Sequence, residues 1–235
     1  MSNPHTNSAY LYSGYSPNQP LGQMPQSVNP DFFVIDDDFL GVVFNATDSW
    51  TVVKDSGASV ALAADTLGGA VLLSSAATTD DDGASIQGNE VFAATADKNI
   101  YFGARVQNES VAAIDFCVGL VENFATNPEA ILTSPNRIAF QIDDGSGLII
   151  CKTEASGTET STTTAVTAVD DTYNKLEISV SGTSVVKFYI DGQLVATHST
   201  NIPTAGITPA MGHISGSATG TRTSQADYII AAQTR

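Results

Sequence analysis

The chain has 235 residues, a formal net charge of -16 and only 14% charged residues, while 42% of its residues are hydrophobic. This length fits one large all-β domain or two small ones, and the hydrophobic content excludes disorder of the whole chain. The acidity disfavours nucleic acid and anionic membranes as partners, and no apolar run or N-terminal pattern predicts membrane insertion or secretion.

The first 30 residues differ in composition from the rest of the chain. They contain no Asp, Glu, Lys or Arg, yet they hold five of the nine prolines and three of the seven tyrosines. Proline at this density disfavours both helix and sheet, so we predict an extended arm over residues 1–30. Either the arm is a disordered leader, or it becomes ordered against a partner. Its predicted partner-binding residues are Tyr10, Leu11, Tyr12, Tyr15, Leu21 and Met24.

From Asp31 onward the pattern is that of β-strands. The clearest segments are short apolar or alternating runs rich in β-branched and aromatic residues, at 100–106, 112–120, 137–143, 147–152 and 175–180. Turn-rich segments lie between them at 80–83, 143–147 and 155–169, and residues 127–132 are expected to form one short turn. About a dozen short strands predict a two-sheet sandwich or a barrel.

The strongest local signal is a hairpin over Val185–His198. Asp191 and Gly192 stand between two apolar runs, and this pair favours a two-residue turn with positive φ at both positions. The predicted register pairs Ile190 with Gln193, Phe188 with Val195, and Val186 with Thr197. It places Val186, Phe188, Ile190 and Val195 on one face, which we expect in the core.

Trp50 and the two cysteines are expected inside the fold. Trp50 lies in a strand-like run, so core packing is favoured over a sugar-stacking role, although the seven tyrosines keep a lectin open. Cys117 and Cys151 each lie in an apolar run without a C-x-x-C pattern. We therefore predict two buried thiols, with one disulfide as the alternative.

Three segments together resemble a known family. They are DDDFLG at 36–41, the block from Leu176 to Pro203, and the closing strand Ala226–Ala232. They are similar to the concanavalin A-like (laminin-G-like) jelly-roll domains of tailed-bacteriophage virion structural proteins, most like a capsid decoration or cement protein. The resemblance covers residues 36–235. It implies an all-β, antiparallel two-sheet jelly-roll sandwich over 31–235, preceded by the arm.

One branch of this fold cleaves polysaccharides. For that branch, the resemblance implies an E-x-D-x-E pattern on a single strand, where alternate positions place all the carboxylates on one face. No such triplet occurs here, and the sequence also lacks a G-x-S-x-G elbow and a phosphate-binding loop. The three histidines, His5, His198 and His213, form no recognisable pattern. We therefore predict no catalytic residues and no enzymatic activity.

Aspartate clusters at 36–38, 80–82 and 143–144 are the candidates for metal binding. None has the spacing of a calcium loop, and adjacent aspartates on a strand point to opposite faces. We predict solvated turn residues, no metal ligands and no cofactor. A structural calcium ion at one cluster is the alternative.

Two functional hypotheses follow. The first is a non-enzymatic virion protein, made in the host cytoplasm, that binds the outer surface of the phage head and bridges neighbouring major capsid protein subunits. Thirty extended residues span up to roughly 90 Å, and a homo-oligomer, with a trimer favoured, would add avidity. The alternative is a carbohydrate-binding module of a tail fibre or surface appendage, with a glycan as partner. Neither nucleic acid nor membrane is an expected partner.

Overall fold

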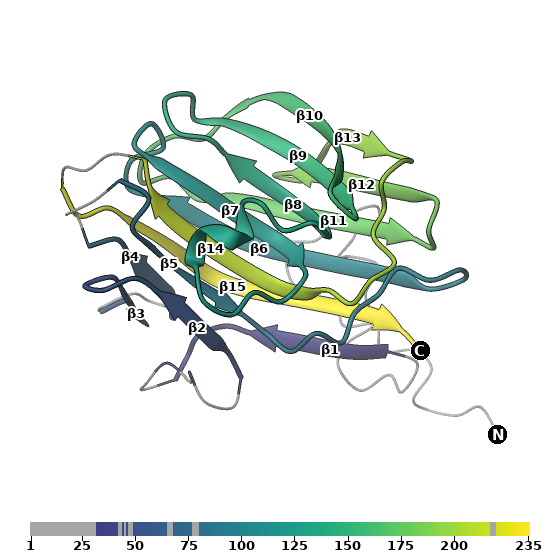
Figure 1. Cartoon of the computed structure of the whole chain (residues 1–235), viewed down its shortest axis with the longest axis horizontal. Coiled ribbons are helices and arrows are strands. Elements are labelled where there is room, and N and C mark those ends of the chain that lie inside the picture. Colours follow the sequence, from purple (N-terminus) through teal and green to yellow (C-terminus); the bar gives the residue numbers. More distant parts are fainter. Residues whose placement is uncertain are drawn as a thin grey trace.

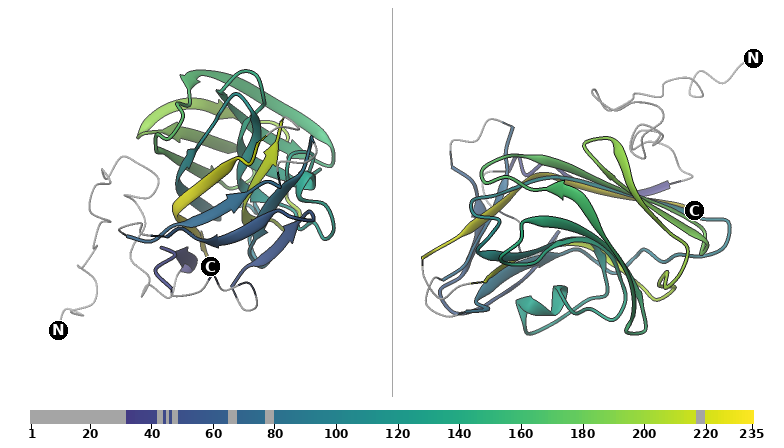
Figure 2. Two further views of the ribbon diagram at one scale, coloured as in Figure 1. Left: turned by 90° about the vertical axis from the view of Figure 1, so that its left-hand side faces the viewer. Right: turned by 90° about the horizontal axis from the view of Figure 1, so that it is seen from above.

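The computed structural model describes residues 32–41, 44, 46, 49–64, 68–76, 80–216 and 220–235. Two antiparallel sheets lie face to face (Figure 1), and Figure 2 shows them as separate layers. This confirms the predicted all-β, two-sheet sandwich. The predicted arm over 1–30 lies outside the described residues, so the boundary between arm and sandwich stays a prediction.

The eight-stranded sheet is built around β6 and the long C-terminal strand β15. Its spatial order is β13 (Gln193–His198), β12 (Val185–Ile190), β11 (Asn174–Ser181), β6 (Asn99–Asn108), β15 (Thr223–Thr234), β4 (Val71–Ser74) and β3 (Ser59–Leu62). The first described strand, β1 (Phe32–Asp37), pairs with the last part of β15, on the edge that β4 pairs with nearer the start of β15.

The seven-stranded sheet forms the second layer. Its spatial order is β10 (Thr158–Thr167), β9 (Leu148–Ala155), β8 (Arg137–Ile142), β7 (Ile114–Val121), β14 (Thr208–Ser215), β5 (Gly83–Gln87) and β2 (Thr51–Lys54). The expected short turn at 127–132 is confirmed as the 3-10 turn η2 (Pro128–Ile131). Among the described residues, no helix is long and apolar enough to cross a membrane.

The main core lies between the sheets, where the inward side chains of both layers meet. Five phenylalanines are almost fully buried there: Phe92, Phe102, Phe116, Phe140 and Phe188. Phe140 of β8 meets Phe188 of β12 edge to face, with ring centroids 5.3 Å apart. Burying a side chain of this size stabilises the fold by roughly 1.5–3 kcal/mol. These rings therefore join the two layers.

Trp50 and the cysteines lie where the sequence placed them. Trp50 is 3% exposed, and its indole Nε1 donates a hydrogen bond to Asp37 Oδ2 at 2.7 Å. Cys117 and Cys151 are both free and buried, which confirms two thiols over a disulfide. Burial raises the pKa of Cys117 to about 11 and that of Cys151 to about 12, so neither thiol ionises near neutral pH.

The predicted hairpin is confirmed in its turn and corrected in its register. Asp191 and Gly192 both have positive φ, and Ile190 pairs with Gln193. The predicted register continues through the next pair, Tyr189 with Leu194, and a bulge at Val195 then shifts it by one residue. Beyond the bulge, Phe188 pairs with Ala196 and Val186 with His198. Ala196 and His198 therefore face the core, and Val195 is only partly buried.

The turn-rich interpretation of 155–169 is wrong. Most of this segment forms β10, an edge strand paired with β9. Threonine favours strands because its branched side chain packs well on a pleated surface, and the alternation of exposed and half-buried residues fits an edge strand. The segment lacks large apolar residues because β10 has no neighbour on its outer side.

His213 of β14 is buried between the layers. Its Nδ1 lies 2.7 Å from Ser224 Oγ, and Ser224 Oγ donates to Asn108 Oδ1 at 2.6 Å. The serine has only one proton to give, so His213 must donate through Nδ1 in its neutral form. Burial lowers the pKa of His213 to about 4, against a smaller opposing effect of the Arg222 backbone.

We predict that His213 makes stability depend on pH. Its pKa in the folded chain lies below its ordinary value of 6.5, so its contribution is complete above pH 6.5 and is lost as the pH falls toward 4. Between pH 7 and pH 4.5 this residue should remove roughly 2–3 kcal/mol of unfolding free energy. Urea unfolding of the wild type and of His213→Asn at both pH values measures the difference. Equal losses in the two proteins would contradict the prediction.

Candidate functional site

The outer face of the seven-stranded sheet divides into two halves. Along β7 the side chains of Ile114, Phe116, Val118 and Leu120 face the main core, so the alternate positions face outward. Near β7 and β14 this outer face is apolar and covered. Near β9 and β10 it is polar and partly exposed.

The covered half is filled by the loop 122–136, which contains η2 and lies in front of the sheet in Figure 1. Ile131 is fully buried and forms a small apolar cluster with the outward residues of three strands, namely Cys117, Val121, Ala139 and Ala210. Gly212 lies directly beneath it, since a Cβ there would stand 2.5 Å from Ile131 Cγ2. A glycine is needed at this position because Ile131 occupies the space of its side chain.

Polar contacts hold this loop in place. Ser85 Oγ donates to the carbonyl of Pro128 at 3.0 Å. The Gln87 side chain pairs with the backbone of Phe124 in both directions, donating to its carbonyl at 2.5 Å and accepting from its N–H at 3.1 Å. The loop is therefore a fixed cover, and this half of the face has no open cleft.

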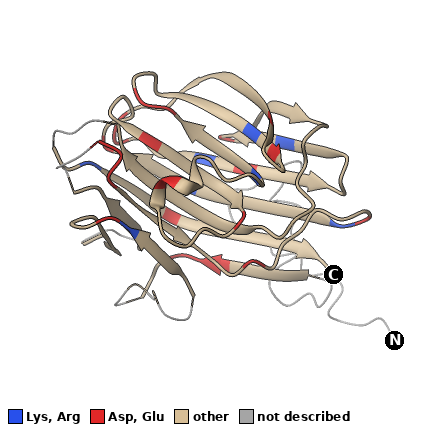
Figure 3. Ribbon diagram, in the orientation of Figure 1, with Lys and Arg blue, Asp and Glu red and all other residues tan. Residues whose placement is uncertain are grey.

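A cluster of charged side chains occupies the other half, and we call it the Arg137 cluster. It comprises Arg137, Gln141, Lys152, Glu154 and Glu159. Arg137, Glu154 and Glu159 are direct cross-strand partners, so they form one row over β8, β9 and β10. Figure 3 shows basic and acidic positions close together near the end of β9.

One guanidinium nitrogen organises the cluster. Arg137 Nη2 lies 2.8 Å from Glu154 Oε2 and 2.9 Å from Glu159 Oε2, while Lys152 Nζ lies 3.2 Å from Glu159 Oε2. Arg137 Nη1 donates to Gln141 Oε1 at 3.2 Å and to the backbone carbonyl of Leu132. The side chains of Arg137 and Glu154 are 4% and 11% exposed, whereas that of Glu159 is 33% exposed.

The cluster keeps the carboxylate of Glu159 ionised. Burial acts to raise the pKa of Glu159, but hydrogen bonds and the charges of Lys152 and Arg137 outweigh it and lower the pKa below its ordinary value. A general acid in glycoside hydrolysis needs a raised pKa. Glu159 is therefore suited to accept hydrogen bonds from a ligand, and not to donate a proton to one.

Exposed hydroxyl groups adjoin the cluster. Ser161 and Thr163 follow Glu159 at alternate positions of β10, so all three share the outer face, and all three are exposed. On the inner side of β10, Thr162 Oγ1 lies 2.9 Å from His198 Nε2, and Thr153 Oγ1 lies 3.0 Å from His198 Nδ1. His198 thus ties the edges of the two sheets together and takes no part in the outer surface.

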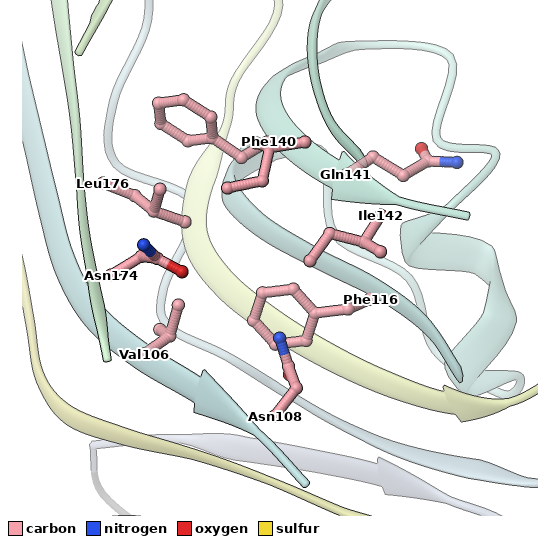
Figure 4. A pocket seen from close by; sticks show the side chains of 9 residues that line it. Val106, Asn108, Phe116, Phe140, Gln141, Ile142, Asn174 and Leu176 are labelled. Carbon is pink, nitrogen blue, oxygen red and sulfur yellow. The ribbon is translucent and has the colours of Figure 1, made fainter. Parts of the chain in front are cut away.

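Two hollows elsewhere in the described residues are poorly suited to a sugar. A small hollow of about 10 Å³ lies between the sheets, with room for about one water molecule. Figure 4 shows apolar side chains such as Phe116 and Leu176 around it, with the amide of Gln141 pointing away. An open groove of about 530 Å³ between β2 and β3 is lined mainly by apolar side chains, with Lys54 as its charged member.

The structure does not test the predicted partner-binding residues of the arm, which stay a prediction. The arm residues Tyr10, Leu11, Tyr12, Tyr15, Leu21 and Met24 lie outside the described residues, as does His5. In the first aspartate cluster, Asp37 caps local structure by accepting from Phe39 N–H at 2.8 Å and from Trp50. Within the described ranges, no group of three His, Cys, Asp or Glu residues is arranged to hold a metal ion.

Sequence reasoning missed the Arg137 cluster. Its members come from three strands and stand up to 22 positions apart in the chain, so no local motif contains them. Glu159 was also placed in a turn-rich segment and not on a strand. The signal that could have found it is the alternation of Glu159, Ser161 and Thr163 with inward threonines, which is a strand pattern without large residues.

Comparisons with known proteins show a likeness of fold to several solved structures. No protein-family model and no curated protein sequence matches the chain. Among solved structures, an endo-1,3-β-glucanase from Streptomyces sioyaensis is 13% identical with a TM-score of 0.63, over 90% of this chain and 99% of that one. A Bacillus licheniformis β-glucanase is 14% identical with a TM-score of 0.59, over 84% and 97%. A protein of unknown function from Shewanella oneidensis MR-1 is 13% identical with a TM-score of 0.64, over 91% of both chains.

This comparison supports the concanavalin A-like jelly roll and corrects one prediction. Several of the similar structures are glucanases, so the chain has a fold of the glycoside-hydrolase type, and the prediction that it is not an enzyme is wrong at this level. That prediction rested on a missing E-x-D-x-E strand. Among the described strands none carries such a triplet, but the fold is similar to that of the glucanases.

We predict that Ile131 holds the loop 122–136 on the sheet. Ile131→Ala should lower the unfolding free energy by roughly 2–5 kcal/mol, because it leaves a cavity above Gly212 and Cys117. Leu132→Ala, which truncates a partly buried neighbour, is the control and should cost less. Urea unfolding at pH 7 compares them. Equal losses in the two variants would show that Ile131 has no special role.

Proposed function

We propose that this protein binds a carbohydrate on the outer face of the seven-stranded sheet, at the Arg137 cluster and the exposed hydroxyl groups of β10. The observation that carries the proposal is the row Arg137, Glu154 and Glu159, which is mostly desolvated at one end and open to solvent at Glu159. Planar charged groups held in fixed positions are suited to accept and donate hydrogen bonds to sugar hydroxyls.

The energetics of the cluster support a role beyond stability. Removing an arginine and a glutamate from water costs several kcal/mol per ion, and a well-packed apolar group is often as stable. In the neighbouring half of the same face, apolar residues pack beneath Ile131. A charged row beside it is therefore costly for packing alone, and pre-positioned polar groups in such a place favour a ligand site.

The chemistry of the face indicates the ligand class. The cluster contains two cations and two carboxylates, so it favours a neutral ligand over a strongly charged one. Among the described residues, Trp50 is in the core, and Tyr101, Tyr189 and Tyr228 belong to strands of the other sheet. The ring of Tyr173 lies against Arg105 of that same sheet. Binding would therefore depend on hydrogen bonds more than on ring stacking. A neutral β-glucan is the natural probe, since the glucanases with this fold are named for such polymers.

The virion hypothesis stays a prediction. Capsid decoration, the major capsid protein as partner, the trimer and the virion location rest on the resemblance and on the arm, which lies outside the described residues. Deleting residues 2–30 and measuring occupancy on phage heads that lack this protein tests the bridging role. Equal occupancy with and without residues 2–30 would reject the bridging role.

We predict that Glu159 contributes directly to glycan binding. Titration calorimetry with laminari-oligosaccharides and mixed-linkage β-glucan oligosaccharides should give saturable binding to the full chain. Glu159→Gln should weaken it tenfold or more, because hydrogen bonds to a charged group contribute about 1.5–3 kcal/mol. Glu109→Gln, at an exposed carboxylate that accepts from Thr223 Oγ1, is the matched control and should bind as the wild type does.

The outcomes separate the alternatives. Absence of saturable binding by the wild type, or equal weakening by both variants, would reject the proposed site. Chromatography of the same samples follows the oligosaccharides over time. Shorter products that disappear in Glu159→Gln or Glu154→Gln would assign hydrolysis to this row of carboxylates and support the site with a catalytic role added.

A further inference from the structure

The outer face of the eight-stranded sheet carries an apolar cluster separate from the main core. We call it the outer patch; it consists of Ile230 and Ala232, with Phe32, Val34, Tyr101 and Tyr228 packed around them. These residues come from β1, β6 and β15, which are neighbours in the sheet. They face away from the main core, whose members on β15 are Ala226, Ile229 and Ala231.

A carboxylate next to the outer patch is buried as well. Glu177 of β11 is directly opposite Gly103 of β6, which in turn is opposite Ile230. On its other side Glu177 faces Tyr189, and Lys175 Nζ lies 3.4 Å from Glu177 Oε2. Glu177 is nevertheless 0% exposed and Ile230 is 2% exposed. Gly103 between them has no side chain, so it covers neither residue.

Within the described part of the chain, no helix or strand is layered on this face. The loop with η2 covers the other sheet, and β1 lies in the plane of the eight-stranded sheet as a paired strand. A glutamate and an isoleucine on the outer face of a sheet normally contact water. Their burial therefore indicates a covering segment beyond the described strands.

The described chain begins beside this face. Phe32 is the first residue of β1 and a member of the outer patch, so residues 1–31 enter at its edge. The first 30 residues carry no charge and include Tyr10, Leu11, Tyr12 and Tyr15. An uncharged segment rich in tyrosine fits an apolar patch, and its hydroxyl groups can donate hydrogen bonds to a buried carboxylate.

We propose that the outer face of the eight-stranded sheet, centred on Ile230 and Glu177, is the docking site of the chain's own residues 1–31. Residues 1–31 are long enough to cross this face of the sheet. Thirty extended residues span up to roughly 90 Å. The sheet is seven strands wide because β1 and β4 lie on the same edge of β15, so at about 4.8 Å between strands it is roughly 30 Å across. The five prolines prevent the segment from adding a regular strand, so it would bind through side chains. In this proposal the arm binds its own domain, and binding to another protein would be an additional role.

Thiol labelling tests this docking directly. The native Cys117 and Cys151 are buried with raised pKa values, so they are slow to react and a new cysteine can be followed alone. Ile230→Cys is made in the full chain and in a chain lacking residues 2–30. We expect the new thiol to react with a thiol reagent at least tenfold faster in the shortened chain. Equal rates would overturn the proposal.

A matched control and a milder variant keep the test decisive. Ser161→Cys lies exposed on the other sheet and should react at the same rate in both chains. If the shortened chain does not fold, the full chain with Tyr10→Ser, Tyr12→Ser and Tyr15→Ser replaces it, and faster labelling of Ile230→Cys is again the expected result. Unchanged labelling in that variant would count against the tyrosines and reject docking through them.

Varying the protein concentration shows whether the segment that covers Ile230 comes from the same chain or from a second copy. Protection of Ile230→Cys that is independent of protein concentration, in a chain whose mass by light scattering is that of a monomer, supports docking within one chain. Protection that disappears on dilution, together with a larger mass, assigns the cover to a second copy and overturns the proposal in its stated form.

Discussion

A two-sheet sandwich buries only one face of each sheet against its partner, and this constraint governs the rest of the molecule. The inward faces meet through phenylalanines such as Phe140 and Phe188 and form the core. Each outer face must then be covered, made polar or used. On the seven-stranded sheet, one half is covered by the loop with Ile131, and the other half carries the Arg137 cluster. On the eight-stranded sheet, the outer patch and Glu177 are buried on a face with no described layer above it.

This division of the outer faces explains the positions of the few charged residues. Most acidic residues lie in turns and at strand ends, where they keep the surface soluble. Arg137 and Glu154 are different because they are nearly buried on an outer face and compensate each other there. A low count of charged residues therefore does not indicate a lack of polar chemistry. It means that the polar chemistry is concentrated in a small part of the surface.

Much of the architecture could be predicted from local pattern. Alternation marked most of the central strands, and Asp191-Gly192 marked the tight turn, because these signals depend only on residues close in sequence. The register from Phe188 onward could not be predicted, since a bulge at Val195 depends on which residues the core accepts. Strand β10 was missed because an edge strand with one neighbour needs few large apolar residues. The absence of a local catalytic motif also led to the prediction of no enzyme, which the likeness of the fold to that of glucanases contradicts.

The sequence by itself determined the fold class, the buried thiols of Cys117 and Cys151, and the core position of Trp50. Each of these follows from hydrophobicity and short-range periodicity, which a chain carries in any context. Only the tertiary structure decided that Arg137, Glu154 and Glu159 form one row, and that Ile230 and Glu177 share a buried outer face. These arrangements depend on which strands become neighbours. Strand order is set by the packing of the whole sandwich, and no local stretch of residues encodes it.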